Sequence, residues 1–167
     1  MKNSGRSLKR RLSLIGNRLS RAKHFRGYGV HSPFVYGLVR KVFMCRHLFE
    51  GCDTGLYDTL LAKKAPEKRA RELNNTMHYC ECRHFSIDCI EGDFAVLTPN
   101  YPTERIASAY EEARAKGAVL VIANPYLNRE RQSEVRRLME LHTSTTVDNR
   151  AYILFFNNRL PKQHYRL

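Results

Sequence analysis

The strongest pattern of apolar positions in the chain begins directly after Ser32 and Pro33. Two sets of apolar residues then recur at every fourth position, which is the spacing of one broad helix face. Ser32 can cap the helix with its hydroxyl, and Pro33 suits the first helical position because its missing N–H would be unpaired there. The pattern predicts a docked helix from about Pro33 to Met44. Its apolar residues are Phe34, Val35, Leu38, Val39, Val42 and Phe43.

A second helical pattern lies closer to the N-terminus, between about Ser7 and Lys23. Apolar residues recur there at spacings of four and three, which places them in one stripe along a helix. The basic side chains fall mostly off this stripe, so the predicted helix is amphipathic and cationic. The stripe consists of Leu8, Leu12, Ile15, Leu19 and Ala22.

The remaining patterns alternate between strands and helices. The run from Ala118 to Ala123 is entirely apolar, which is typical of a strand buried on both faces of a parallel sheet. Thr103 and Asn128 are the expected N-caps of the last two helices, and Gly117 is the expected C-terminal stop. We expect strands at about 84–90, 93–98, 118–123, 144–147 and 151–156, and helices at about 54–64, 66–74, 104–116 and 129–142.

This order of elements predicts an α/β fold. Strand, helix and buried strand between residues 93 and 123 form a βαβ unit, which makes the sheet mostly parallel. The short turn at 148–150 joins the last two strands in antiparallel fashion. The predicted architecture is a small, mostly parallel sheet with an antiparallel C-terminal edge, flanked by helices and preceded by a basic helical N-terminus. A basic, partly extended tail follows from residue 157.

Charge divides the chain into two parts. Residues 1–49 carry 12 Lys and Arg and no Asp or Glu, which leaves 17 of the 29 basic residues against all 16 acidic ones. Nearly all of the formal net charge of +13 therefore lies in the first 49 residues. We interpret residues 1–26 as a basic amphipathic arm, and residues 27–167 as a single α/β domain of nearly neutral charge.

Three interpretations of the arm are open. The apolar stripe can pack on the domain, where it would cover an edge or a face of a small sheet. The cationic face can bind the phosphates of a nucleic acid or another polyanion. The helix can also lie on an anionic membrane surface. The candidate polyanion-binding residues are Lys9, Arg10, Arg11, Arg18, Arg21, Lys23 and Arg26.

Two parts of the sequence resemble a known family. The segment G-Y-G-V-H-S-P-F-V-Y at 27–36, and the C-terminal segments 148–156 and 160–167, are similar to those of bacterial class I S-adenosylmethionine (SAM)-dependent O-methyltransferases. The resemblance implies a Rossmann-like, methyltransferase-like domain. It also implies a SAM site built from a glycine-rich turn after the first strand and an acidic residue after the second.

The sequence departs from that family where the cofactor would bind. No strand is followed by a glycine-rich turn and a helix, and the end of the fifth family strand, acidic in the related enzymes, reads Ala123-Asn124-Pro125-Tyr126 here. His31, Asn124 and Tyr126 remain as a possible remnant of a ligand pocket, without a catalytic residue. We therefore predict a binding protein that has lost SAM-dependent catalysis, needs no cofactor, and binds a polyanionic or protein partner through its basic N-terminal arm. The alternative is an active SAM-dependent methyltransferase with a rebuilt or subunit-shared site, and a purely structural homodimer is a third hypothesis.

Cysteine usage points to a reducing compartment. The five cysteines have no disulfide spacing, and no apolar run is long enough for a membrane span or a signal peptide, so we expect a cytoplasmic protein.

One segment has the alternation that zinc ligands can show, with His78, Cys80, Cys82 and His84 at every second position. On a strand they would extend over roughly 20 Å, too far for one tetrahedral ion, so no metal site is predicted.

Overall fold

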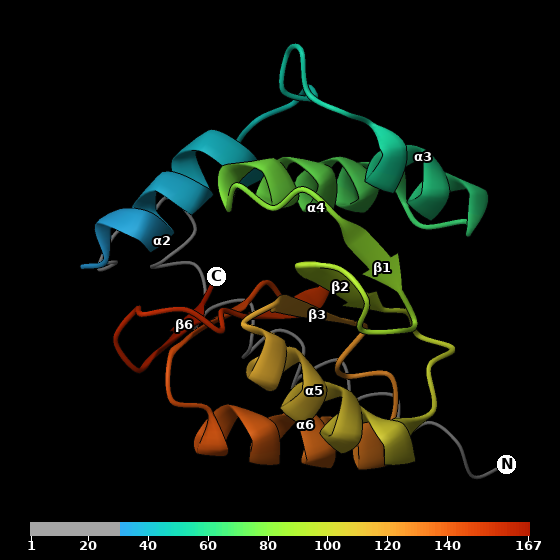
Figure 1. Cartoon of the computed structure of the whole chain (residues 1–167), viewed down its shortest axis with the longest axis vertical. Helices are drawn as coiled ribbons and strands as arrows, with labels where there is room; N and C mark the ends of the chain where they lie inside the picture. The colour runs from blue at the N-terminus through green and yellow to red at the C-terminus, as the bar shows by residue number, and fades with distance from the viewer. Residues whose placement is uncertain (1–30) are drawn as a thin grey trace, which may run out of the picture.

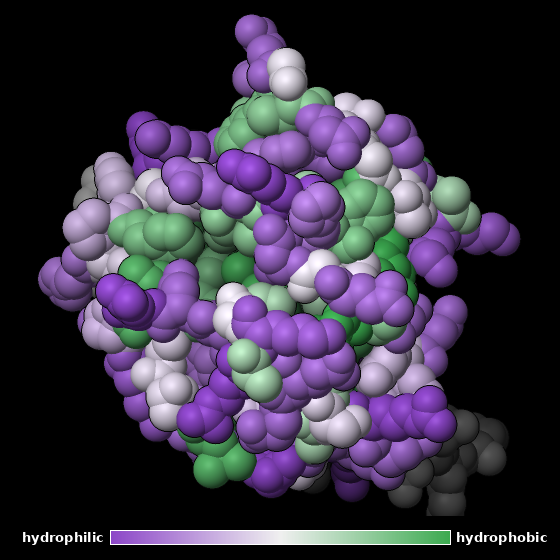
Figure 2. Space-filling model, in the orientation of Figure 1, coloured by the Kyte–Doolittle hydropathy of each residue, from purple (hydrophilic) through white to green (hydrophobic). Residues whose placement is uncertain are grey.

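The computed structural model describes residues 31–167, which form one six-stranded sheet between two layers of helices (Figure 1). This confirms the predicted α/β class. The basic arm and its seven candidate cations lie outside the described residues. Hydrophilic side chains cover most of the face shown in Figure 2, with smaller apolar areas between them. None of the described helices is long and apolar enough to cross a membrane.

The helices begin and end close to the predicted positions, with one clear exception. The helix predicted to stop at Asn74 continues to Tyr79. The segment from His78 to His84 is therefore a helix end and a turn, and our assumption that it forms a strand is wrong. The helical elements are α2 (Pro33–Leu38), η1 (Val39–Phe43), α3 (Gly55–Ala62), α4 (Glu67–Tyr79), η2 (Thr103–Arg105), α5 (Ile106–Lys116) and α6 (Arg129–Leu141).

The docked helix after Ser32 has the predicted start. The Ser32 hydroxyl accepts a hydrogen bond from the Val35 N–H at 3.3 Å, and Pro33 occupies the first turn. Its second half, η1, is π-helical, so each backbone hydrogen bond there spans five residues instead of the four of an α-helix. Val35, Leu38 and Val42 are buried against the sheet side, which confirms the predicted apolar face.

Buried amide side chains extend α4 beyond the predicted end. Asn74 and Asn75 are fully buried. Asn74 accepts from the Tyr57 N–H at 3.1 Å and donates to the Asp53 carbonyl at 3.1 Å. Asn75 makes a matching pair of bonds to the loop before α3, at 3.1 Å and 2.9 Å. The two residues hold α3 and its preceding loop on α4 through backbone hydrogen bonds.

The sheet has the order β1-β2-β3-β5-β4-β6. β1, β2 and β3 are parallel, and β5 runs antiparallel between β3 and β4. β6 pairs in parallel with β4 at one edge, within the tail for which no strand was predicted. The strands are β1 (Phe85–Ile87), β2 (Phe94–Leu97), β3 (Val119–Ala123), β4 (Thr145–Asp148), β5 (Tyr152–Phe155) and β6 (Gln163–Arg166).

Of the three boundaries predicted for the last two helices, two are confirmed. Gly117 ends α5 with φ 68°, a left-handed conformation that glycine adopts without steric cost. Asn128 caps α6 by accepting from the Arg131 N–H at 2.7 Å. The predicted Thr103 cap is wrong, because the 3-10 turn η2 precedes α5 and Pro102 takes the cap position without a side-chain bond.

The two faces of the sheet build two apolar cores. Val119 and Val121 of β3 pack with α2, α3 and α4, whereas Leu120 and Ile122 pack with α5 and α6. This alternation follows from the period of two along a strand, and it confirms that the run is buried on both sides. Helices of the described chain cover both faces of the sheet.

One histidine, His142, is buried beside the core that the sheet forms with α5 and α6. His142 Nδ1 lies 2.9 Å from the Tyr110 hydroxyl, and Nε2 lies 3.3 Å from the Phe156 carbonyl oxygen. A neutral ring with its proton on Nε2 donates to Phe156 and accepts from Tyr110. Burial lowers the pKa of His142, and the nearby His164 and Arg114 lower it further, against the bond to Phe156.

We expect the protein to lose stability as the pH falls below about 6.5. The unfolded chain then binds a proton that the folded state resists at His142, so the free energy of unfolding decreases with falling pH by up to about 1.4 kcal/mol per unit. Partial desolvation and the nearby Lys162 and Arg166 also lower the pKa of His164, which adds a smaller effect in the same direction because this side chain is largely exposed. Urea unfolding at about pH 7.5 and 5.5 measures the difference.

The variants His142→Gln and His164→Gln separate the two histidines. His142→Gln should reduce stability at neutral pH but flatten its pH dependence. If both variants keep the full pH dependence of the wild type, the assignment to these histidines is contradicted.

Candidate functional site

The parallel strands end on one side of the sheet, and a polar residue follows each of them. Asp88 follows β1, Thr98 follows β2 and Asn124 follows β3. In open α/β sheets, ligands bind in the crevice outside the carboxyl ends of the parallel strands. This side of the sheet is therefore where we look for a site.

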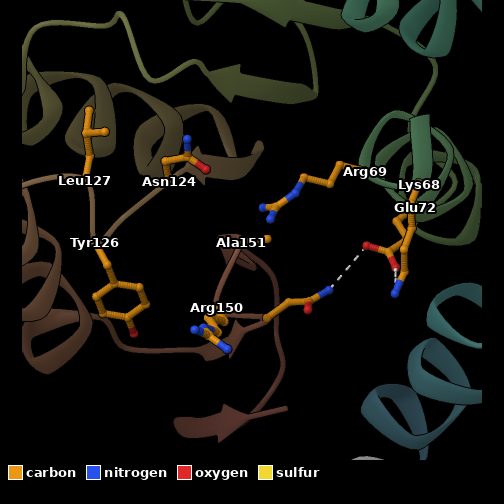
Figure 3. Close-up of a pocket in the computed structure, with 9 residues that line it drawn as sticks. Lys68, Arg69, Glu72, Asn124, Tyr126, Leu127, Arg150 and Ala151 are labelled. Atoms are coloured by element: carbon orange, nitrogen blue, oxygen red, sulfur yellow. Dashed lines mark hydrogen bonds and ion pairs between the residues drawn. The ribbon is translucent and has the colours of Figure 1, made fainter. Parts of the chain in front are cut away.

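Two adjoining cavities open at these strand ends. The first, about 420 Å³, lies between the α3–α4 turn and the ends of β1, β2 and β3. The second, about 550 Å³, extends towards the β4–β5 turn and is lined by Tyr126 and Arg150 (Figure 3). Arg69, Asn124 and Ala151 line both, so the cavities form one continuous groove.

Unusual backbone conformations gather around this groove. Lys64, Asp88, Asn124 and Arg150 have φ values of 61°, 58°, 45° and 56°. Glu81, at the end of α4, is the fifth non-glycine residue with positive φ between positions 31 and 167. Such conformations cost roughly 1–2 kcal/mol for a residue with a side chain and concentrate at functional sites. Their clustering marks the groove as a functional candidate.

The carboxylates at the strand ends are engaged inside the protein. Asp88 accepts from the backbone N–H of Thr98 at 2.7 Å and from its hydroxyl at 2.9 Å. The fully buried Asp148 accepts from the Arg150 N–H at 2.7 Å and from the Tyr126 hydroxyl. These bonds fix the loops after the strands and occupy oxygens that a general base would use.

Glu72 of α4 is the third carboxylate beside the groove, and it is almost fully buried. It accepts from the Tyr152 hydroxyl at 3.0 Å and lies 3.5 Å from the Asn149 amide and 3.7 Å from the Lys68 ammonium. Burial raises the pKa of Glu72, and the Tyr152 bond and nearby cations partly offset this. Burial and the neighbouring Glu72 raise the pKa of Tyr152 well above its usual value. The hydrogen bond between Tyr152 and Glu72 tethers β5 to α4.

One buried arginine holds the strand ends together. The side chain of Arg131, in the first turn of α6, is 1% exposed. Its guanidinium donates to the carbonyls of Thr98 at 3.0 Å, Tyr101 at 3.0 Å and Ala123 at 3.1 Å. Burial lowers the pKa of Arg131, and the nearby Asp88 opposes that shift. Arg131 thus fixes the loop after β2 against the end of β3.

Cationic side chains line the groove from the α4 side. Lys63 and Lys64 lie at the α3–α4 turn, Lys68 and Arg69 lie on α4, and Arg150 lies across the second cavity. The Arg69 side chain points from α4 into the groove, towards Asn124 and Ala151 (Figure 3). Its Nη1 is buried and has no hydrogen-bond partner among residues 31–167. An unpaired buried donor costs about 1–3 kcal/mol.

Two of the three predicted pocket residues line the groove, and the third does not. Asn124 and Tyr126 line the same cavity, as two members of a pocket would. His31 is exposed and lines neither cavity. Sequence reasoning missed Asp88 and Thr98, although the rule that polar residues follow parallel strands would find them. It also missed Arg69 and Glu72, because nothing in the mixed charge of α4 marks its inward face.

The described strand ends do not offer the glycine-rich turn that a SAM site requires. The loop from β1 leads directly to β2, and its only glycine, Gly92, lies against the chain itself. A Cβ at Gly92 would lie 2.2 Å from the His84 carbonyl oxygen, so this glycine serves local packing. The connections from β2 to η2 and from β3 to α6 contain no glycine.

Cysteines and histidines in the described part of the chain form no cluster of metal ligands. Burial raises the pKa of the Cys80 thiol far above its usual range and that of Cys82 to about 12. Both thiols are therefore protonated at neutral pH and are poor nucleophiles. The groove, and not the cysteine segment, is the candidate site.

We expect Arg131→Met to destabilise the protein by about 2–4 kcal/mol, because the three hydrogen bonds from the buried guanidinium to the carbonyls of Thr98, Tyr101 and Ala123 are lost. The control is Arg136→Met, an exposed position on the same helix, where the expected change is within about 0.5 kcal/mol. Chemical unfolding monitored by circular dichroism measures both. Equal stability of the two variants would contradict a structural role for Arg131.

Comparison of the chain with models of protein families, with curated proteins and with solved structures gives no match in any of the three.

Proposed function

We propose that the chain is a methyltransferase-like binding module that has lost SAM-dependent catalysis and binds a polyanion through its basic arm. The observation that carries the first half is the state of the carboxylates at the strand ends. Asp88, Asp148 and Glu72 all accept hydrogen bonds from the protein itself. A binding role needs only the shape and the charge of this surface, whereas a transferase also needs a cofactor cradle.

The distribution of charge supports a polyanion as the partner. Twelve basic residues and no acidic one fall within residues 1–49, while the rest of the chain is nearly neutral. A concentrated cationic segment on a neutral body attracts phosphates and releases their counterions on binding. The resemblance of residues 27–36, 148–156 and 160–167 to segments of O-methyltransferases supports a methyltransferase-like origin of the domain.

We expect the full chain to bind duplex DNA or RNA with an affinity that falls steeply as salt rises. If all seven arm cations contact phosphates of B-DNA, the slope of log K against log salt is about −6. Fluorescence anisotropy with labelled duplexes, from about 50 to 200 mM salt, measures it. An affinity that stays flat over this range would contradict the proposal.

A matched pair of variants tests whether the arm carries the binding. Neutralising Arg10, Arg11, Arg18 and Arg21 to Gln should reduce the slope by about 4. The control neutralises four exposed arginines of the folded body, Arg105, Arg114, Arg129 and Arg136, and should leave most of the slope in place. Equal effects of the two sets would show that net charge alone, and not the arm, binds the nucleic acid.

The alternative is an active SAM-dependent methyltransferase with a rebuilt or subunit-shared site, for which the open groove at the strand ends would be the natural place. Isothermal calorimetry with SAM and with S-adenosylhomocysteine distinguishes the two functions. The binding-module proposal expects no heat of binding from either compound. Saturable binding of both would favour the enzyme.

A further inference from the structure

The charge at the cationic end of the first cavity is only partly offset, by Asp88 in the lining and by Glu72, which interacts electrostatically with Arg69. Arg69, Lys63 and Lys64 line it together, and none of them forms an ion pair with a carboxylate of residues 31–167. Asp88 is the acidic residue in the same lining, and both of its oxygens accept from Thr98. The buried Nη1 of Arg69 lacks an acceptor. This end is therefore built to receive a compact anion.

The remaining walls of the cavity do not suit a bare inorganic ion. Leu60, Leu73 and Val96, which are buried, and Pro99 line it as apolar surface. The volume of about 420 Å³ lies in the range of pockets for small organic ligands and is far larger than a phosphate ion needs. The anion must therefore be attached to an apolar or planar body.

Two amides complete the lining. Asn100 and Asn124 follow β2 and β3, and each offers a donor and an acceptor. An asparagine amide can form paired hydrogen bonds to the edge of a nucleobase. An apolar wall, two amides and cationic side chains, of which Arg69 points towards Asn124, match a planar base joined to a phosphate.

We propose that this cavity binds a nucleoside monophosphate group, with its phosphate on Arg69, Lys63 and Lys64 and its base between the apolar wall and the asparagines. The group can belong to a free mononucleotide or to the 5′-phosphorylated end of a nucleic acid strand. The site lies in the folded domain, so it does not depend on binding by the arm. Either binding mode can fail while the other holds.

Calorimetric titration of the full chain with AMP, GMP, CMP and UMP tests the site. At least one nucleotide should bind saturably below about 10 mM, and adenosine and inorganic phosphate should each bind at least ten-fold more weakly than AMP if AMP is that nucleotide. Absence of saturable binding for all four nucleotides overturns the proposal. Inorganic phosphate that binds as tightly as the nucleotides overturns it as well.

Variants test the role of Arg69. Arg69→Met keeps the length of the side chain but removes its charge, and should weaken nucleotide binding ten-fold or more. Arg71→Met is the control on the same helix, because Arg71 lines neither cavity of the groove and should leave the affinity within about two-fold. The double variant Lys63→Gln, Lys64→Gln gives an independent test if Arg69→Met does not fold. Unchanged affinity in every folded cavity variant overturns the assignment.

Oligonucleotides then distinguish the two sources of the ligand. They are titrated against a chain whose four arm arginines Arg10, Arg11, Arg18 and Arg21 are replaced by Gln. If the ligand is a strand end, a 5′-phosphorylated oligonucleotide binds at least ten-fold tighter than its 5′-hydroxyl form, and Arg69→Met removes the difference. If the ligand is a free mononucleotide, AMP or its counterpart binds and the two oligonucleotides do not differ.

Discussion

The guanidinium of Arg131 is the interaction on which the candidate site depends. Three carbonyls converge on this one buried side chain: those of Thr98 and Ala123 at the ends of β2 and β3, and that of Tyr101 in the loop after β2. The α6 helix that carries Arg131 is placed by the Asn128 cap, whose oxygen accepts from the Arg131 backbone. The N-cap at Asn128, a local signal, thereby positions the Arg131 side chain for its contacts with the loop after β2 and the end of β3. The hydrogen bonds of Arg131 hold the loop after β2 against the end of β3, and these segments border the groove.

The division between anionic and cationic groups gives the groove its chemical character. Its carboxylates belong to the framework, since Asp88 fixes a loop, Asp148 fixes a turn and Glu72 joins α4 to Tyr152. Of the cations on its rim, Lys68 lies 3.7 Å from Glu72, whereas Lys63, Lys64 and Arg69 form no ion pair with a carboxylate of residues 31–167. A surface of this kind favours anions as ligands and offers little for proton transfer.

The sequence predicted those parts of the fold that depend on neighbouring residues. The Ser32–Pro33 start, the Asn128 cap, the Gly117 stop and the buried strand at 118–123 all rest on signals within a few positions. The full length of α4 could not be predicted, because Asn74 and Asn75 are satisfied by backbone 17 to 28 residues away. The strand β6 was missed because its exposed side chains carry no apolar alternation. For the site, Asn124 and Tyr126 were found through their place after a strand, whereas Arg69 acquires its role only when α4 packs across the strand ends.

The left-handed residues around the groove have a consequence for how the protein can change. Lys64 and Arg150 hold a backbone conformation that glycine would adopt freely, so replacement by glycine at either position would relieve strain in the folded state. That relief would compete with the greater chain entropy that glycine adds to the unfolded state. A chain selected for stability alone has little reason to keep a long cationic side chain at such a position. At Lys64 and Arg150 the groove therefore gains a cationic side chain at the cost of backbone strain, which is one form of the trade-off between stability and activity.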